Sequence, residues 1–261
     1  MKENALDRTI VPLDGMSRAE CIQFVKKTHG KIKWVKVGME AFYRDGKDLI
    51  FELKNSYDLN IFLDLKLHDI PNTVSKAIES LHQLPIKFLT IHLTGGENML
   101  SAAYHAAEKF LPDTKLLGVS YLTSLDQRDF KEIWNLDQES VKKSFENLTH
   151  IALRNKIHGM VLSAHELPIV LNVVKNVYQH PNDEFSKRQI PELVCPGIRF
   201  QDEIDNNQTQ DQKRTSCPQN AFASGAHYIV MGRSLTTAKD LTQRLDQLSA
   251  ISLAKHFAQS P

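Results

Sequence analysis

The residues best suited to chemistry lie in one stretch, residues 60–73, which reads NIFLDLKLHDIPNT. Its first apolar residues have the length and composition of a buried strand. Asp64 and Lys66 are two residues apart, so in a strand their side chains project from the same face. Asp69 follows the strand end, and Pro71 suits the first turn of a helix. We therefore expect two carboxylates and one ammonium group to converge where this strand gives way to a loop.

Two interpretations of this charged cluster are open from the residues alone. Burying three charges is costly and a stable core does not need them, which favours a functional role. The alternative is a structural ion pair, with Lys66 as a salt-bridged residue at the strand end. In either case, carboxylates on both sides would keep the ammonium group of Lys66 protonated.

Short apolar runs alternate with helix-like segments along the whole chain. The expected strands are residues 9–13, 34–38, 61–63, 86–93, 116–121, 158–162, 192–195 and 228–231. The expected helices include residues 17–28, 40–53, 71–83, 98–110, 125–155 and 164–178. Eight such repeats without a shift in composition favour the α/β class, as a single parallel (β/α)8 TIM-barrel domain over residues 1–261, rather than a doubly wound sheet. Two polar stretches interrupt the pattern, a surface insertion at residues 179–189 and a long loop at residues 201–216.

Polar residues also recur at the carboxyl ends of other expected strands. The clearest are Asp14 in VPLD, Lys36 in VKVG, His92 in TIHL and Thr123 in YLTS. Singly, each has a structural interpretation as a cap or a satisfied strand-end group, and His92 is expected to be structural or supporting. A barrel brings all eight strand ends around one pocket, so their common position predicts a shared site.

Two arginines follow the last two strands and suggest a phosphate site. Arg199 ends the segment CPGIR, and Arg233 follows Gly232 in MGRS. A glycine lets the backbone approach a ligand, and an arginine adds a bidentate contact to phosphate. The loops after strands seven and eight are the usual phosphate site of this barrel. The alternative is two solvated arginines without a ligand.

Composition and charge exclude several classes of function. The chain has 261 residues, 41% of them hydrophobic, and a net charge of +1, which gives no indication of nucleic acid or an anionic membrane as a partner. No apolar run approaches membrane-spanning length, and residues 1–14 lack the apolar core of a signal peptide. Cys21, Cys195 and Cys217 match no metal or redox spacing. We therefore expect a cytoplasmic protein without a metal site.

The central stretch closely resembles the signature of the orotidine 5′-phosphate decarboxylase family. The resemblance rests on the pattern Asp64-x-Lys66-x-x-Asp69-Ile70-Pro71-x-Thr73, preceded by Phe62-Leu63. It implies an enzyme that needs no cofactor and converts orotidine 5′-monophosphate to uridine 5′-monophosphate and CO2 in pyrimidine synthesis. Lys66 would protonate the carbanion at C6 of the pyrimidine, and Asp64 would crowd the departing carboxylate.

The resemblance also implies roles for residues elsewhere in the chain. Asp14 and Lys36 match residues that hold the ribose hydroxyls, and Thr123 matches a contact on the pyrimidine side. The family residues on the phosphate side of the substrate are matched by Arg199, Gln212, Gly232 and Arg233. Because Gln212 lies inside the polar stretch at residues 201–216, this stretch is expected to be a lid that closes over phosphate. Asp69, Ile70 and Thr73 match residues that reach into the neighbouring subunit's site, so a homodimer is implied.

Two other functions remain open. A magnesium-dependent sugar-phosphate decarboxylase or aldolase of the same barrel superfamily shares the Asp-x-Lys-x-x-Asp element and the phosphate site. The Ile70-Pro71-x-Thr73 continuation and the Leu122-Thr123-Ser124 segment argue against it. The second is a catalytically silent barrel that binds nucleotide phosphates, against which the intact set of Asp64, Lys66 and Asp69 argues.

Overall fold

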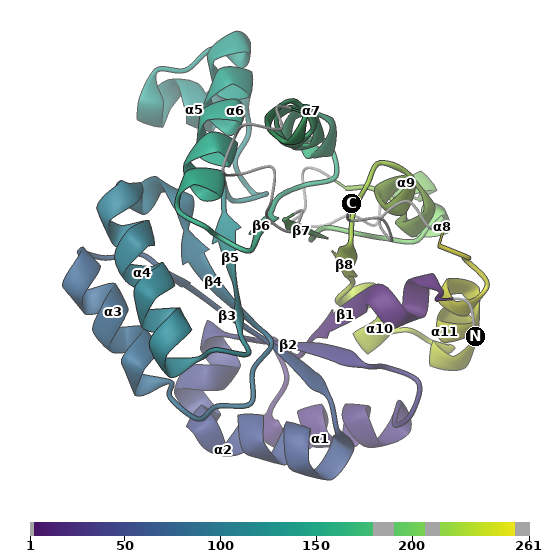
Figure 1. Cartoon of the computed structure of the whole chain (residues 1–261). Helices are drawn as coiled ribbons and strands as arrows, with labels where there is room; N and C mark the ends of the chain where they lie inside the picture. The colour runs from purple at the N-terminus through teal and green to yellow at the C-terminus, as the bar shows by residue number, and fades with distance from the viewer. Residues whose placement is uncertain (1–2, 180–190, 207–214, 254–261) are drawn as a thin grey trace.

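Eight parallel strands pair in chain order, and β8 returns to β1 to close a barrel (Figure 1). This is a computed structural model, and it describes residues 3–179, 191–206 and 215–253. The strands are β1 (Thr9–Pro12), β2 (Trp34–Gly38), β3 (Asn60–Leu67), β4 (Phe88–His92), β5 (Lys115–Val119), β6 (Gly159–Val161), β7 (Glu192–Cys195) and β8 (Tyr228–Val230). The predicted (β/α)8 TIM-barrel fold is confirmed.

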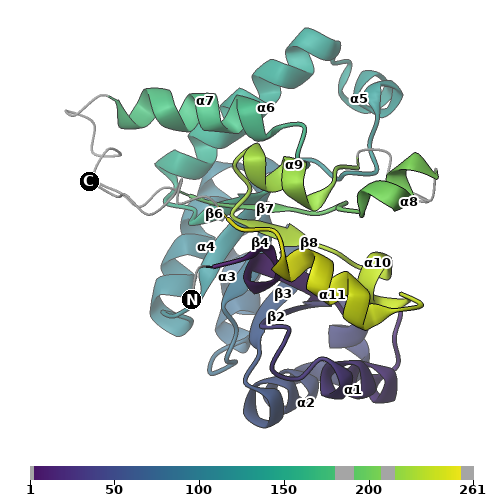
Figure 2. The ribbon, with the colours of Figure 1, turned by 90° about the vertical axis from the view of Figure 1, so that its right-hand side faces the viewer.

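Helices connect the strands and cover the outside of the barrel. They are α1 (Arg18–Lys27), α2 (Met39–Tyr57), α3 (Pro71–Ser80), α4 (Gly96–Phe110), α5 (Gln127–Trp134), α6 (Gln138–Arg154), α7 (Leu167–Tyr178), α8 (Gln201–Asp205), α9 (Pro218–Ala223), α10 (Arg233–Thr236) and α11 (Leu241–Ser249), with 3-10 turns η1 (Ala5–Arg8) and η2 (Leu93–Gly95). Helices α5 and α8, which follow β5 and β7, lie at the carboxyl end of the barrel, on the right in Figure 2. Within the described part of the chain, no helix is long and apolar enough to cross a membrane.

The helical material expected over residues 125–155 forms two helices, α5 and α6, with a break between them. Asn135 takes the left-handed conformation at φ 54° and ends α5. Asp137 then caps α6 by accepting the N–H of Ser140 at 2.8 Å. Short polar side chains favour both positions over the helix interior, which is why the chain turns here.

The two polar stretches are described only in part. Residues 180–190, which include most of the expected insertion at 179–189, lie outside the described residues. Of the stretch at 201–216, Gln201–Asp205 forms α8, and residues 207–214 lie outside the description.

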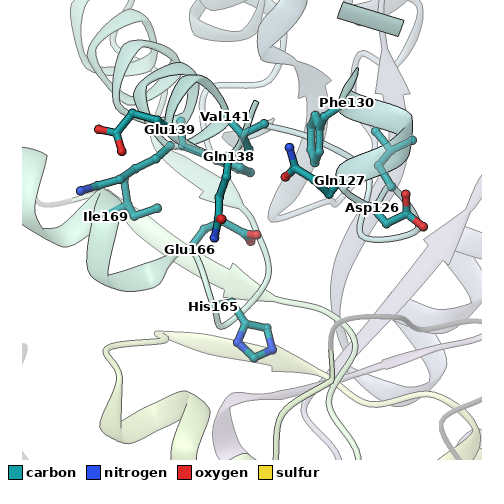
Figure 3. A pocket seen from close by; sticks show the side chains of 12 residues that line it. Asp126, Gln127, Phe130, Gln138, Glu139, Val141, His165, Glu166 and Ile169 are labelled. Atoms are coloured by element: carbon teal, nitrogen blue, oxygen red, sulfur yellow. The ribbon is translucent and has the colours of Figure 1, made fainter. Parts of the chain in front are cut away.

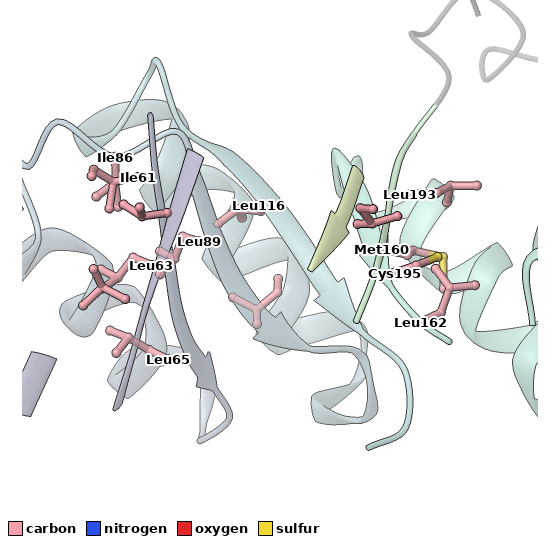
Figure 4. Packing of buried hydrophobic residues seen from close by; sticks show 14 of the residues in the cluster. Ile61, Leu63, Leu65, Ile86, Leu89, Leu116, Met160, Leu162, Leu193 and Cys195 are labelled. Carbon is pink, nitrogen blue, oxygen red and sulfur yellow. The ribbon is translucent and has the colours of Figure 1, made fainter. Parts of the chain in front are cut away.

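Alternation along each strand separates two apolar layers. In β3, Ile61 and Leu63 point outward and pack with the layer between strands and helices, where Leu89 of β4 and Leu193 of β7 also lie (Figure 4). Phe62 points inward and joins the smaller cluster inside the barrel. Asp64 has the same parity as Phe62, so it faces the barrel interior.

Aromatic rings fill the amino end of the barrel interior. Phe88 stacks on Trp34 with ring centroids 4.7 Å apart and meets Tyr228 edge-on at 5.3 Å. Phe62, which pairs with Phe88 across β3 and β4, meets its ring edge-on at 5.9 Å. Since this end is closed by rings, a ligand site inside the barrel is restricted to the carboxyl end, where polar side chains replace the aromatics.

Two half-buried histidines should make the fold sensitive to mild acid. His158 accepts the N–H of Leu116 at Nδ1 over 3.0 Å, and His227 accepts that of Leu193 over 3.1 Å. Burial lowers the pKa of both imidazoles. The unfolded chain therefore binds more protons than the folded chain once the pH falls below about 6.5, and the free energy of unfolding falls by at most about 1.4 kcal/mol per pH unit for each histidine.

We expect the double variant His158→Asn/His227→Asn to lose less stability between about pH 7 and pH 5 than the wild-type chain, because an amide does not titrate. Denaturant unfolding at each pH measures the free energy of unfolding. His92 and the carboxylates titrate in both proteins, so the difference in slope isolates the two replaced imidazoles. Equal slopes would contradict the assignment.

Candidate active site

The centre of the charged cluster is the carboxylate of Asp64, which is buried at the carboxyl end of β3. The Nζ atom of Lys66 lies 2.8 Å from Oδ1 and 2.9 Å from Oδ2 of this carboxylate. On the other side, Nζ of Lys36 lies 3.2 Å from Oδ2. One buried carboxylate thus holds two ammonium groups.

Asp14 completes an alternating row of charges. Its carboxylate forms an ion pair with Lys36, and its Oδ1 accepts the N–H of Gly38 at 3.0 Å. A Cβ atom at Gly38 would lie 2.1 Å from that oxygen, so only glycine leaves room for the carboxylate. The row runs Asp14, Lys36, Asp64, Lys66, and its members come from the turn after β1 and from β2 and β3.

Asp64 and Lys36, at the centre of the row, are both charged at neutral pH. Burial alone would raise the pKa of Asp64, but the ammonium groups of Lys36 and then Lys66 outweigh it and hold this pKa below its usual value. Burial would likewise lower the pKa of Lys36, but Asp64 and Asp14 outweigh it and raise this pKa. An ionised carboxylate between two ammonium groups fixes both of them in place.

A bulge in β3 turns Lys66 toward Asp64. Leu63 pairs with Leu89 and Leu67 with Ile91, so the register of β3 shifts between these two pairs. Within the shifted segment Lys66 has φ 48°, a left-handed conformation that is uncommon for a residue with a side chain. Ordinary strand alternation therefore explains why Lys66 faces the interior but not how its ammonium group folds back onto Asp64.

Thr90 of β4 contacts both residues and was not among the predicted site residues. Its hydroxyl lies 2.8 Å from the backbone N of Lys66 and 2.9 Å from Oδ1 of Asp64. The sequence does contain an indication of this role. Thr90 is a polar residue inside the apolar run FLTIH, and strand alternation places it on the same inward face as His92.

Two stacked histidines lie beside the cluster. The rings of His68 and His92 have centroids 4.9 Å apart and planes 21° apart, and Nδ1 of His92 is 2.6 Å from Oγ1 of Thr94. Burial, followed by the charges of His68 and Lys66, lowers the pKa of His92 to about 4. His92 is therefore neutral at physiological pH and adds no charge to the row.

Asp69, Ile70 and Thr73 do not join the row within one chain. All three are exposed where β3 leads into α3, and Ile70 is 67% exposed. The carboxylate of Asp69 accepts the N–H of Ile70 at 2.7 Å and forms no ion pair within the described part of the chain. The expected convergence of both carboxylates on Lys66 therefore does not occur inside a single subunit.

The two predicted arginines lie at equivalent places on neighbouring strands. Cys195 of β7 pairs with Ile229 of β8, and each is followed four residues later by an arginine, Arg199 and Arg233. Arg199 is buried, and its Nη1 donates to the carbonyl of Ile198 at 3.0 Å. Arg233 is exposed.

The structure gives less detail for the remaining predicted site residues, Gly232, Thr123 and Gln212. Gly232 immediately precedes α10, and a Cβ atom there would meet Pro12 at 3.2 Å, so a side chain would crowd the start of the neighbouring loop. Thr123 is half-buried between β5 and α5. Gln212 lies outside the described residues.

A cavity of about 540 Å³ lies between α5, α6 and the segment between β6 and α7, away from Lys66. Figure 3 shows Gln127 and Phe130 on one side of this cavity and Glu139 and Ile169 on the other. It contains none of the predicted site residues. Among the described residues, no group of three or more His, Cys, Asp and Glu side chains is arranged to hold a metal ion.

Known proteins resemble the chain over nearly its whole length. The Orotidine 5'-phosphate decarboxylase / HUMPS family matches residues 7–248. An orotidine 5'-phosphate decarboxylase of Ehrlichia canis is 37% identical over 245 residues, which cover 94% of this chain and 97% of the relative. An orotidine 5'-phosphate decarboxylase of Opitutus terrae is 36% identical over 231 residues, which cover 88% of this chain and 92% of the relative. The crystal structure of orotidine 5'-phosphate decarboxylase from Lactobacillus acidophilus superposes with a TM-score of 0.70 at 28% identity, covering 93% of this chain and 97% of that one. The chain belongs to the Orotidine 5'-phosphate decarboxylase / HUMPS family.

Proposed function

We propose that the chain decarboxylates orotidine 5′-monophosphate to uridine 5′-monophosphate and CO2 in pyrimidine nucleotide synthesis. The observation that carries this proposal is the ammonium group of Lys66, held by both oxygens of a buried, ionised Asp64 at the mouth of the barrel. The names of the relatives support the same activity.

The chemical step requires a group that stabilises negative charge at one carbon. Loss of CO2 leaves a carbanion at C6 of the pyrimidine, which enolate resonance does not delocalise. The preorganised ammonium group of Lys66 lowers the energy of that charge and then donates its proton to C6. Asp64 holds the ammonium group of Lys66 at 2.8 Å, and its own charge repels the carboxylate that departs.

The remaining predicted residues bind the nucleotide around this centre. Asp14 and Lys36, already paired with each other, take the ribose hydroxyls. Thr123 takes the pyrimidine edge. The phosphate is held by Arg199, Gln212, Gly232 and Arg233. Binding energy from this remote group orients the ring and drives the lid closure expected of the stretch at residues 201–216, which raises turnover rather than affinity alone.

The function assay follows the absorbance of orotidine 5′-monophosphate with purified protein in the presence of excess EDTA. We expect turnover that chelation leaves intact, and we expect Lys66→Ala to lose about 10²-fold or more, because positioned proton donors contribute about 10²–10⁴-fold. Lys76→Ala is the matched control, since Lys76 is an exposed lysine on α3. Its Nζ atom lies 2.6 Å from Oε2 of Glu79.

Each rival has its own outcome in this assay. Activity that EDTA abolishes and magnesium restores, on a sugar phosphate instead, would favour the magnesium-dependent enzyme. Binding of the nucleotide without any turnover would favour the silent barrel. We also propose the cytoplasm as the compartment, which is supported by three buried thiols that are all free: Cys21, Cys195 and Cys217.

We further propose that the enzyme is a homodimer in which Asp69, Ile70 and Thr73 enter the partner's site. The support is that Asp69 is exposed and unpaired with Lys66 in one chain, and that Ile70 presents a large apolar side chain beside it. A carboxylate from the partner would then supply the second neighbour that the Lys66 ammonium group needs.

Mixed dimers test this shared site. Lys66→Ala and Asp69→Ala should each be inactive, whereas subunit exchange between them should restore roughly a quarter of wild-type activity. Random exchange makes about half of the dimers mixed, and each mixed dimer has one intact site of two. A mass tag verifies exchange. No recovery despite exchange would show that both residues serve the same chain's site.

A further inference from the structure

Thr90 is the residue of β4 that faces the bulge in β3. Between the pairs Leu63 with Leu89 and Leu67 with Ile91, β3 contributes three residues and β4 contributes only Thr90. An ordinary parallel ladder would satisfy the backbone N–H of Lys66 with a carbonyl of the neighbouring strand. Here the hydroxyl of Thr90, which is 0% exposed, accepts that N–H instead, at 2.8 Å.

The directions of these hydrogen bonds follow from the groups themselves. A backbone N–H only donates and an ionised carboxylate only accepts, so the Thr90 hydroxyl accepts from Lys66 and donates to Asp64. Asp64 in turn accepts from the ammonium group of Lys66. The three residues form a closed ring, from the Lys66 backbone through Thr90 and Asp64 to the Lys66 side chain.

This ring couples the backbone of Lys66 to the position of its own ammonium group. Lys66 is held at φ 48°, a conformation that needs support from its surroundings. Without the hydroxyl, its N–H would lose a buried acceptor and Asp64 would lose one of its donors. Asp64 would then be held only by its two lysines, and the backbone N–H of Lys66 would no longer be tied to that carboxylate.

We propose that Thr90 is a positioning residue for the decarboxylation, with its hydroxyl fixing the Lys66 ammonium group at the place where the C6 carbanion forms. The inference rests on the proposed function for the reaction it serves. Thr90 is 0% exposed and its hydroxyl contacts only Lys66 and Asp64 among the described residues, so its contribution is to geometry, and it should act on turnover more than on substrate binding.

The test compares Thr90→Val, Thr90→Ser and Thr90→Ala with the wild-type enzyme in steady-state turnover of orotidine 5′-monophosphate. Valine keeps the shape and removes the hydroxyl, whereas serine keeps the hydroxyl. Thr9→Val is the matched control, because Thr9 is also 0% exposed in a barrel strand and its hydroxyl donates to a carbonyl, that of Ala5, at 2.7 Å.

We expect Thr90→Val to lower kcat by about 10- to 100-fold with KM changed less than about threefold, since displacement of a catalytic group by about 1 Å costs on the order of 10²-fold. Thr90→Ser should stay within about threefold of wild-type kcat, and Thr9→Val should leave kcat unchanged. Faster hydrogen exchange of the Lys66 amide in Thr90→Val, measured by NMR, should accompany the loss.

Three outcomes would overturn the proposal while wild-type turnover still supports the function. One is an unchanged kcat per folded Thr90→Val enzyme, with only the free energy of unfolding reduced. Another is an equal loss of kcat in Thr90→Ser and Thr90→Val, which would show that shape and not the hydroxyl matters. If Thr90→Val does not fold, the comparison is between Thr90→Ser and Thr90→Ala. Equal kcat in these two variants overturns the proposal, whereas a kcat near wild type in Thr90→Ser alone supports it. Absence of turnover in the wild-type enzyme would instead reject the proposed function itself.

Discussion

The site depends on one buried carboxylate that binds two ammonium groups. Taking Asp64 out of water is costly, and the contacts of Lys36 and Lys66 at 3.2 and 2.8 Å offset that cost. Removal of either lysine would leave an excess of negative charge in the barrel mouth. The same contacts hold the ammonium group of Lys66 in one place, and electrostatic stabilisation of a carbanion requires such preorganisation.

The barrel supplies this arrangement by dividing its interior into two ends. Rings of Trp34, Phe88 and Tyr228 fill the amino end, and the charged row lies at the carboxyl end. Regular alternation brings Lys36 and Asp64 inward from β2 and β3. Two irregular features complete the site: the absence of a side chain at Gly38, which admits Asp14, and the bulge in β3, which turns Lys66 back.

The sequence predicted the regular features better than the irregular ones. Alternating apolar runs predicted the barrel, and strand parity placed Asp64 and Lys66 on one face, because both depend on local periodicity. The bulge and the role of Thr90 depend on the register between β3 and β4, which no local pattern encodes. The sequence predicted helical material over residues 125–155 without placing the break at Asn135, because an amphipathic pattern continues on both sides of it.

The central claim is that the ammonium group of Lys66 stabilises negative charge at C6. An enzyme that stabilises the carbanion formed from the substrate should also stabilise the same carbanion formed from the product by loss of its C6 proton. Proton NMR of uridine 5′-monophosphate in D2O measures this directly as the loss of the H6 signal. The wild-type enzyme should exchange H6 for deuterium, and Lys66→Ala should not, although it still binds the nucleotide. Exchange by Lys66→Ala at the wild-type rate would contradict the claim.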